Sequence, residues 1–283
     1  MQLIRHLLRL YLSKFPITEG KKYIYMFAKK YFIPKQTKII SKMKYGFYLK
    51  LNLQNPEHQY YYFYMSHDER YEINNLQNII QSSDICWDIG ANIGFYSFLF
   101  SSIVNDGEVV AFEPISKTYD DLKIAKEINK YKNIKVNNYA LGSHCEDKKI
   151  FYSHSDLSIG TASFLNSDLF KNSELVHINT IDDICNGLKI PDFLKIDVEG
   201  FQEEVIKGAS VFFQNNAPLI MIEIDRNTGQ WLEDYFLSLN YQFYRFHKNH
   251  ISQVDSIFSN GRNILFCKGD SIYSKRINSV MHG

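Results

Sequence analysis

Several features that would assign this chain to a particular class of protein are scarce or absent. Its four cysteines are far apart and form no C-x-x-C pair, so we expect neither a disulfide framework nor a zinc site, and a reducing compartment is favoured. The net charge is +1, which gives no overall bias toward nucleic acid. Arg5 and Arg9 interrupt the apolar stretch near the N-terminus, which is therefore too short and too charged for a signal peptide or a membrane span. We expect a cytoplasmic protein.

Acidic residues are nearly absent from the first 50 positions, where Glu19 stands against twelve lysines and arginines. Leucines and aromatic residues between positions 3 and 15 are spaced as in an amphipathic helix. This helix either packs on the rest of the chain as a cap, or meets an anionic partner: the inner face of a membrane, or an acceptor for which it provides a basic rim. We assign residues 1–70 to a basic N-terminal extension and residues 71–283 to the main domain.

The segment I-C-W-D-I-G-A-N-I-G-F, from Ile85 to Phe95, predicts a buried strand, a glycine turn and a helix that begins at Gly94. Glycines let the backbone approach a ligand closely, and free N–H groups at a helix start favour anionic groups. Asn92 stands where the dinucleotide fingerprint G-x-G-x-x-G has its second glycine, and Asp88 lies two residues before Gly90. A carboxylate there suits a ligand with a cationic amino group, such as S-adenosylmethionine, and would repel a pyrophosphate.

The next two predicted strands bring further candidate residues to the same edge of the sheet. V-V-A-F-E-P, from Val109 to Pro114, is an apolar strand that closes on Glu113, where an acid is placed to hold a ribose diol. The strand from Ile134 to Asn138 runs into Y-A-L-G, which places Asn138 and Ala140 at this edge. Together these residues predict a cofactor site.

A second unusual segment is D-F-L-K-I-D-V-E-G-F, from Asp192 to Phe201. Lys195 and Asp197 interrupt an otherwise apolar strand and lie on one face of it, because side chains alternate with period two. Glu199 follows at the strand end, which is where open α/β sheets bind ligands. The alternative is a buried ion pair without a chemical role.

The following strand, L-I-M-I-E-I-D, places Glu223 and Asp225 at its tip. With Asp197 and Glu199 they make four carboxylates that could bind a hard divalent cation. The spacing alone leaves open whether a metal is required.

The rest of the pattern alternates strands with helices. Strands are expected over 85–89, 109–113, 134–138, 193–197, 218–225, 241–246 and 263–268, and helices over 72–82, 94–104, 117–130, 201–208 and 228–239. Before this core, Lys38 to Leu53 and Tyr60 to Met65 are interpreted as strands of an entry hairpin, with Y-Y-Y-F-Y as a half-buried strand. Residues 143–180 form an insertion with a polar loop, 155–173, over the cofactor edge, and this is a natural acceptor lid.

The combined motifs resemble the FkbM family of S-adenosylmethionine-dependent methyltransferases, a branch of the class I methyltransferase fold. The resemblance rests on D-I-G-A-N-I-G at 88–94, F-E-P at 112–114, N-Y-A-L-G at 138–142 and L-K-I-D-V-E-G-F at 194–201. It implies an α/β, Rossmann-like, seven-stranded sheet with helices on both faces, and S-adenosylmethionine as the cofactor. Positions that match the cofactor residues of the family are Asp88, Gly90, Asn92, Gly94, Glu113 and Asn138.

The resemblance also implies methyl transfer, usually to a hydroxyl of a sugar in a surface glycan or of a secondary metabolite. Lys195, Asp197 and Glu199 match the second family signature. We expect Asp197 and Glu199 to act as base or metal ligand, with Lys195 orienting a carboxylate or holding the acceptor.

Two other functions compete with this one. A nucleic-acid methyltransferase is disfavoured because the main domain lacks a dense basic stripe. A non-catalytic cofactor-binding module is disfavoured because it need not retain the charged K-I-D-V-E-G segment. A nicotinamide-dependent dehydrogenase is weaker still, since position 92 is not glycine.

Overall fold

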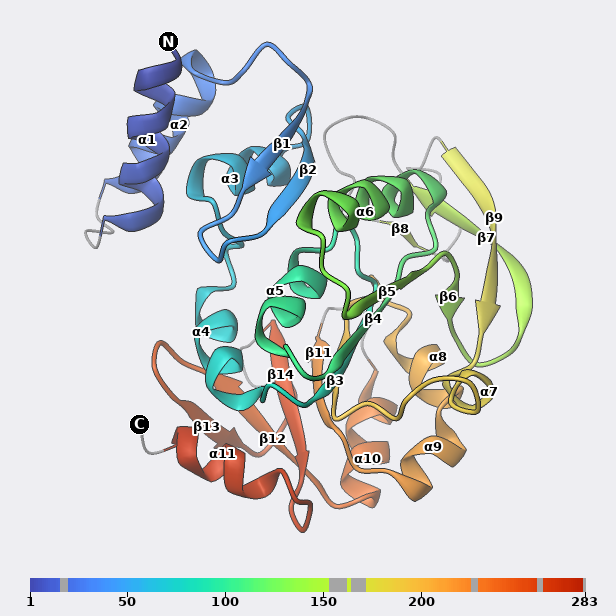
Figure 1. The fold of residues 1–283 in the computed structure, drawn as a ribbon. Helices are drawn as coiled ribbons and strands as arrows, with labels where there is room; N and C mark the ends of the chain where they lie inside the picture. Colours follow the sequence, from blue (N-terminus) through green and yellow to red (C-terminus); the bar gives the residue numbers. More distant parts are fainter. Residues whose placement is uncertain (16–19, 153–161, 164–171, 225–228, 259–261, 282–283) are drawn as a thin grey trace.

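The computed structural model describes residues 1–15, 20–152, 162–163, 172–224, 229–258 and 262–281. Its centre is an eight-stranded sheet with the strand order β13-β12-β14-β11-β10-β3-β4-β5 (Figure 1). The strands are β3 (Ile85–Ile89), β4 (Glu108–Phe112), β5 (Ile134–Asn137), β10 (Phe193–Ile196), β11 (Leu219–Glu223), β12 (Tyr241–Phe246), β13 (Ile251–Val254) and β14 (Asn263–Lys268).

The five strands from β5 to β11 pair in parallel, while β14 pairs antiparallel with both β11 and β12. This is the predicted class I methyltransferase sheet with its reversed end, so the expected fold is confirmed. The structure adds an eighth strand, β13, which pairs antiparallel with β12 at the edge of the sheet. Only four residues long, β13 carried no pattern that predicted it.

Helices cover both faces of this sheet, because its strands are apolar on both sides. Cys86 and Val109 face one core, which is shared with α4, α5, α6 and α11. Trp87 and Val110, each one residue further along, face the opposite core, which is shared with α8, α9 and α10. The helices are α4 (Arg70–Ile79), α5 (Phe95–Ile103), α6 (Ser116–Asn129), α7 (Ile181–Ile184), α8 (Gln202–Lys207), α9 (Ser210–Asn215), α10 (Gln230–Ser238) and α11 (Ser274–Met281).

The N-terminal segment packs beside the sheet. Its elements are α1 (Gln2–Lys14), α2 (Lys21–Tyr31), β1 (Lys38–Lys42), β2 (Tyr48–Asn52) and α3 (Pro56–Tyr64). β1 and β2 form an antiparallel pair, β2 contacts α6, and α1 contacts both α2 and α3. The expected helix near the N-terminus is confirmed as α1, whereas α2 was not predicted.

The prediction of a strand over Tyr60 to Met65 is wrong, because these aromatic residues belong to α3 and to the residue that ends it. Asn55 caps the helix by accepting a hydrogen bond from the backbone N–H of Glu57 at 2.8 Å, and Pro56 occupies the first helical turn. Burial of Tyr61, Tyr62 and Phe63 in a helix that packs against α1 and β2 then outweighs the preference of aromatic residues for strands.

The insertion between β5 and β10 forms a second, four-stranded sheet with the order β6-β9-β7-β8. Its strands are β6 (Ala140–Leu141), β7 (Glu146–Tyr152), β8 (Ala162–Ser163) and β9 (Asn172–Asn179). Strand-like pieces were expected here. Most of the predicted polar loop, 155–173, lies outside the described residues, so its role as a lid stays a prediction.

Within the part of the chain that the structure describes, no helix combines the length and the apolarity needed to cross a bilayer.

Candidate functional site

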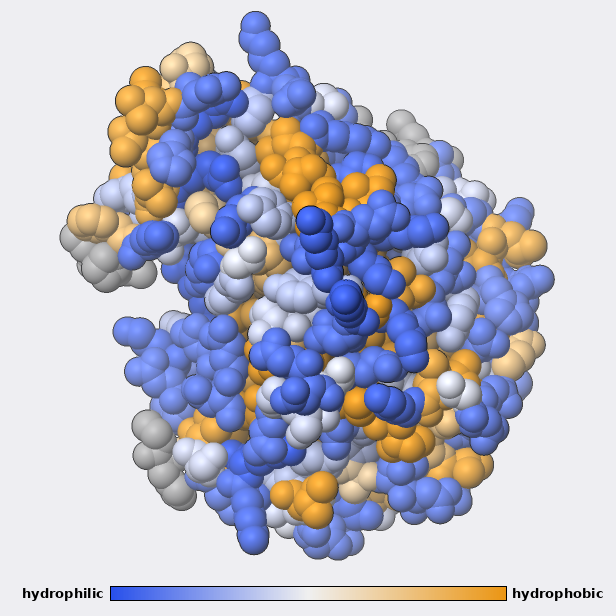
Figure 2. All heavy atoms as spheres, in the orientation of Figure 1, coloured by the Kyte–Doolittle hydropathy of each residue, from blue (hydrophilic) through white to orange (hydrophobic). Residues whose placement is uncertain are grey.

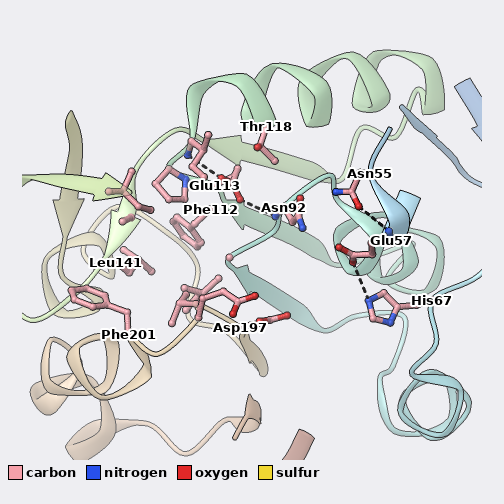
Figure 3. Close-up of a pocket in the computed structure, with 18 of the residues that line it drawn as sticks. Asn55, Glu57, His67, Asn92, Phe112, Glu113, Thr118, Leu141, Asp197 and Phe201 are labelled. Atoms are coloured by element: carbon pink, nitrogen blue, oxygen red, sulfur yellow. Dashed lines mark hydrogen bonds and ion pairs between the residues drawn. The ribbon is translucent and has the colours of Figure 1, made fainter. Parts of the chain in front are cut away.

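A pocket of about 400 Å³ opens where the parallel strands β3, β4 and β10 end (Figure 3). Gly90 follows β3, Glu113 follows β4 and Asp197 follows β10, and all three line the pocket. In Figure 3 an apolar group with Phe112, Leu141 and Phe201 lies on one side, and Glu57 and His67 lie on the other. The remaining described lining residues are Asn55, Pro56, Asp68, Glu69, Ile89, Asn92, Pro114, Ile115, Thr118, Tyr139, Ala140, Ile150, Val198, Glu199 and Arg262.

The glycine turn after β3 is built by close packing against neighbouring backbone. Gly90 has φ +82°, and a Cβ there would lie 1.9 Å from the carbonyl oxygen of Asp197. Asn92 also has a left-handed backbone, with φ +49°. Gly94 precedes α5 with φ +89°, where a Cβ would lie 2.3 Å from the Leu122 side chain. Of the two predicted glycines, Gly90 therefore lines the pocket, whereas Gly94 starts the helix and does not.

Asp88 lies beneath the pocket and not on its wall. It is fully buried, accepts a hydrogen bond from Ser97 Oγ at 2.5 Å and lies 3.7 Å from Lys195 Nζ. Burial raises the pKa of Asp88, although the Lys195 ammonium and the Ser97 hydroxyl oppose this. The expected direct contact with a cationic amino group is not what this geometry provides, because α5 and Lys195 enclose the carboxylate.

Glu113 occupies the predicted position at the tip of β4. Its carboxylate accepts hydrogen bonds from the backbone N–H groups of Asn92 and Ile115, both at 2.9 Å. Burial raises the pKa of Glu113 to about 7 despite these two bonds. The carboxylate is thus held in place at the pocket wall and titrates near neutral pH.

The two predicted residues after β5 differ in placement. The Asn138 side-chain amide donates to the carbonyl oxygens of Glu113 at 3.0 Å and Pro114 at 2.9 Å, so it fixes the turn after β4 and does not line the pocket. Ala140 does line it, beside Tyr139.

The second predicted group surrounds Lys195, whose side chain is buried. Its ammonium donates to Asp197 at 3.0 Å and lies 4.9 Å from the centre of the Tyr96 ring. Burial favours the neutral lysine, but Asp197 and Asp88 outweigh it and raise the pKa of Lys195. Lys195 therefore orients Asp197 from below and does not itself line the pocket.

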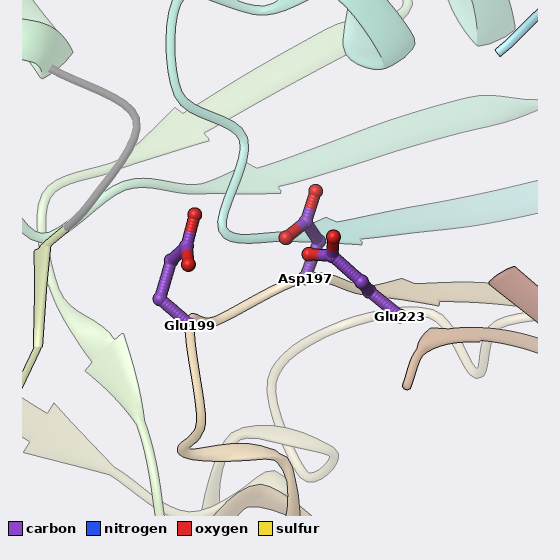
Figure 4. Close-up of side chains that lie close together, drawn as sticks. All are labelled: Asp197, Glu199 and Glu223. Carbon is purple, nitrogen blue, oxygen red and sulfur yellow. The ribbon is translucent and has the colours of Figure 1, made fainter. Parts of the chain in front are cut away.

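Asp197, Glu199 and Glu223 bring one carboxylate oxygen each within 4.8 Å of one another (Figure 4). Burial opposes ionisation of Asp197, but Lys195 and a hydrogen bond from Glu223 hold its pKa well below the usual range. Burial and the neighbouring Asp197 raise the pKa of Glu223 to about 9, although Arg262 donates a hydrogen bond to it.

This carboxylate group offers the oxygen ligands that hard cations prefer. Lys195 and Arg262 already form ion pairs with two of its members, Asp197 and Glu223. Asp225 lies outside the described residues. Metal binding by Asp197, Glu199 and Glu223 stays the alternative to a metal-independent site.

Seventeen of the described lining residues were not predicted as site residues, and six of them lie at 55–57 and 67–69, before the main domain. His67 Nδ1 lies 2.8 Å from Asp68 Oδ1 and 3.5 Å from Glu69 Oε2, and its Nε2 lies 4.0 Å from Glu57 Oε1. Burial lowers the pKa of His67, but the three carboxylates more than offset this and raise it above the ordinary value. The sequence S-H-D-E-R at 66–70 is a dense titratable cluster and was the one available signal.

Glu69 connects the N-terminal segment to the sheet. Its buried carboxylate accepts hydrogen bonds from Tyr96 Oη at 2.5 Å and from Asn263 Nδ2 at 2.8 Å. Tyr96 belongs to α5 and Asn263 begins β14, so one carboxylate joins three parts of the chain at the pocket.

Residues 88–248 match the model of the methyltransferase FkbM domain. The hexuronic acid methyltransferase AglP of Haloferax volcanii is 27% identical over 150 residues, which are 51% of this chain and 57% of that protein.

Two solved structures show lower similarity. Methyltransferase FkbM of Methylobacillus flagellatus aligns over 74% of this chain and 52% of its own, with 18% identity and a TM-score of 0.45. An S-adenosylmethionine-dependent O-methyltransferase of Thermotoga maritima aligns over 71% of this chain and 64% of its own, with 11% identity and a TM-score of 0.40. This chain thus spans less than two thirds of the length of each of these relatives.

Proposed function

Since the chain belongs to the FkbM methyltransferase family, whose model matches more than half of its residues, we propose that it transfers a methyl group from S-adenosylmethionine to a hydroxyl oxygen. The acceptor is a sugar of a surface glycan or a secondary metabolite. The observation that carries this proposal is the shared pocket, which places Glu113 and an apolar wall together with Asp197 and His67.

The residues present fit the cofactor. Glu113 keeps carboxylate lone pairs for a ribose diol, because each of its oxygens accepts one backbone hydrogen bond and a carboxylate has about four acceptor sites. Ile115, Tyr139 and Leu141 supply an apolar wall for a purine ring. When bound, S-adenosylmethionine supplies an electrophilic methyl group on a sulfonium. The chain must then align the acceptor oxygen with that methyl and exclude water.

Two side chains are suited to the acceptor hydroxyl. Asp197 is ionised and held by Lys195, so it can accept a hydrogen bond from the hydroxyl and orient it. The neighbouring carboxylates raise the pKa of His67 above its ordinary value, and in its neutral form the imidazole can take the proton. We assign Asp197 to orientation of the hydroxyl and charge stabilisation, with His67 as the candidate base. In the metal-dependent alternative, Asp197, Glu199 and Glu223 would hold the ion and acidify the hydroxyl.

The charge of the pocket bears on the acceptor class. Its described lining residues include six acids, Glu57, Asp68, Glu69, Glu113, Asp197 and Glu199, against one arginine and one histidine. Carboxylates accept hydrogen bonds from sugar hydroxyls and repel anions. We therefore favour a neutral sugar over a uronic acid, the acceptor named for the Haloferax volcanii relative, and over a nucleic acid.

The test is transfer from methyl-labelled S-adenosylmethionine to a panel of neutral sugar glycosides, uronates and oligonucleotides. The expected product is a methyl ether on a neutral sugar, whose label survives mild alkali. Label that alkali releases would indicate a methyl ester on a uronate carboxylate and would contradict hydroxyl transfer. The same assay applies to the Asp197→Asn variant, which should transfer far less label. Asp234→Asn changes an exposed position on α10 in the same way and serves as its matched control.

A further inference from the structure

The outward faces of α1 and α2 carry large apolar side chains. On α2 these lie at positions 23, 26, 27 and 31, which share one side of a helix. Tyr23 is 76% exposed, Met26 56% and Phe27 52%. On α1, Leu3 and Leu7 are 70% and 56% exposed, and Figure 2 shows apolar atoms gathered over this helix. We call the outward faces of these two helices the apolar stripe.

The apolar stripe is exposed although both helices pack against the rest of the chain. Leu12 of α1 and Ala28 of α2 are fully buried, and Lys21 Nζ donates to the Leu12 carbonyl oxygen at 2.9 Å. Both helices are therefore fixed on the chain by their inner faces, with the stripe on the outside. Single exposed apolar side chains are ordinary, but several on the outer sides of two helices in contact mark an interaction surface.

Positive charge borders the stripe. Lys14, Lys22 and Lys30 are exposed on the same two helices. Beside α1 lies a groove of about 470 Å³ whose described lining residues include Arg5, His6, Arg9 and Lys38 and no acid.

Within this groove, Arg9 is fixed by donating to the Tyr62 carbonyl oxygen and to Ser41 Oγ, both at 2.8 Å. Arg5 Nε is buried and has no hydrogen-bond partner among the described residues. A buried donor without an acceptor, in a groove lined by cations, fits a phosphate oxygen.

We propose that α1 and α2 lie on the surface of an anionic lipid bilayer, with the apolar stripe in the interface and the basic groove on a headgroup phosphate. Helices of 13 and 11 residues are too short to cross a bilayer and suit this in-plane position. Charge favours a bilayer over a second copy of the chain at this surface. A second copy would bring an equally basic surface and be repelled, whereas anionic lipids would be attracted. The inference is independent of methyl transfer.

Vesicle co-sedimentation of the full chain tests this, with phosphatidylcholine vesicles that contain 30% phosphatidylglycerol or none. We expect binding to the anionic vesicles that weakens with salt, and little binding to the neutral ones. Met26→Gln with Phe27→Gln should weaken binding at least tenfold. Lys22→Gln with Lys30→Gln should weaken it by about fivefold for each cation.

Matched controls are Leu237→Gln with Ile272→Gln, and Lys248→Gln with Lys275→Gln, which are equally exposed positions on the main domain. These should bind as the unchanged protein does. Equal binding to both vesicle types, no binding at all, or stripe variants that bind like the controls would overturn the proposal. A dimer of the unchanged protein that only the stripe variants lose would also overturn it, because the surface would then bind a second copy of the chain. So would displacement of the chain from vesicles by an acidic protein, if vesicle binding did not depend on lipid charge. Thermal unfolding of each variant shows that it is folded.

Discussion

α2 and α5 are short helices rich in aromatic and aliphatic residues, and they direct these residues in opposite ways. In α5, Phe98 and Leu99 are fully buried against the sheet, whereas Met26 and Phe27 of α2 are more than half exposed. Charge differs in the same sense, because acids predominate in the pocket beside α5 and cations border α2. The chain thus has two surfaces with opposite electrostatic character. One suits neutral, hydroxyl-rich ligands, and the other suits an anionic, apolar partner.

The largest expected effect of any single change is at Asp197. Asp197→Asn keeps the shape but removes the charge that Lys195 stabilises, and we expect turnover to fall by roughly 10²–10⁴ with cofactor affinity little changed. Assays with EDTA and with added Mg²⁺ separate the two mechanisms, because only a metal-dependent site loses activity on chelation. Near-normal turnover of Asp197→Asn would leave Lys195 and Asp197 as a structural ion pair.

His67 tests whether the N-terminal segment contributes to the chemistry of the pocket. We expect His67→Gln to lower turnover by about 10²-fold, the low end for loss of a general base. Because carboxylates raise the pKa of His67, turnover of the unchanged protein should rise with pH as the imidazole loses its proton, and the variant should lose this rise. An unaltered pH profile in the variant would assign His67 a packing role.

Substitutions of Glu113 test the proposed contact between its carboxylate and the ribose of S-adenosylmethionine. Glu113→Ala should weaken binding of S-adenosylmethionine by roughly 1–3 kcal/mol, measured by calorimetry. The pKa of Glu113 is raised to about 7, so the carboxylate form that accepts a diol hydrogen bond predominates above this pH, and affinity should rise as pH passes through 7. Glu113→Gln should abolish this dependence. Equal affinities for the unchanged protein and Glu113→Ala would remove the ribose assignment.

The smallest effects are expected at the apolar stripe. Met26→Gln should change the free energy of unfolding by no more than about 0.5 kcal/mol and leave turnover on a soluble acceptor unchanged, because the side chain is exposed and does not line the pocket. Thermal denaturation and a soluble-acceptor assay measure both. A loss of activity would show that the two surfaces are coupled.

The sheet could be predicted from sequence because its strands are continuous apolar runs between polar breaks. β3 begins and ends as expected, with the polar residues Ser82 to Asp84 before it and the turn at Gly90 after it. α3 was predicted wrongly because Asn55 and Pro56 set a helix start that aromatic composition obscured.

The candidate site could be predicted only in part, for a different physical reason. Glu113 and Asp197 lie at strand ends, and strand ends of a parallel sheet meet at one edge whatever the loops do. His67 and Arg262 reach the same pocket from segments nearly 200 residues apart, which only tertiary packing brings together. Asp88 was predicted at the right strand end, but a period-two pattern does not show that Ser97 and Lys195 enclose it.

The most direct measurement is a comparison of surface glycans from cells with the gene, without it, and with the gene restored either unchanged or as Asp197→Asn. We predict that deletion removes one methyl ether from a neutral sugar, that the unchanged gene restores it, and that the Asp197→Asn gene does not. Identical methylation in all four strains, together with no transfer from labelled S-adenosylmethionine by the purified chain, would contradict glycan O-methylation.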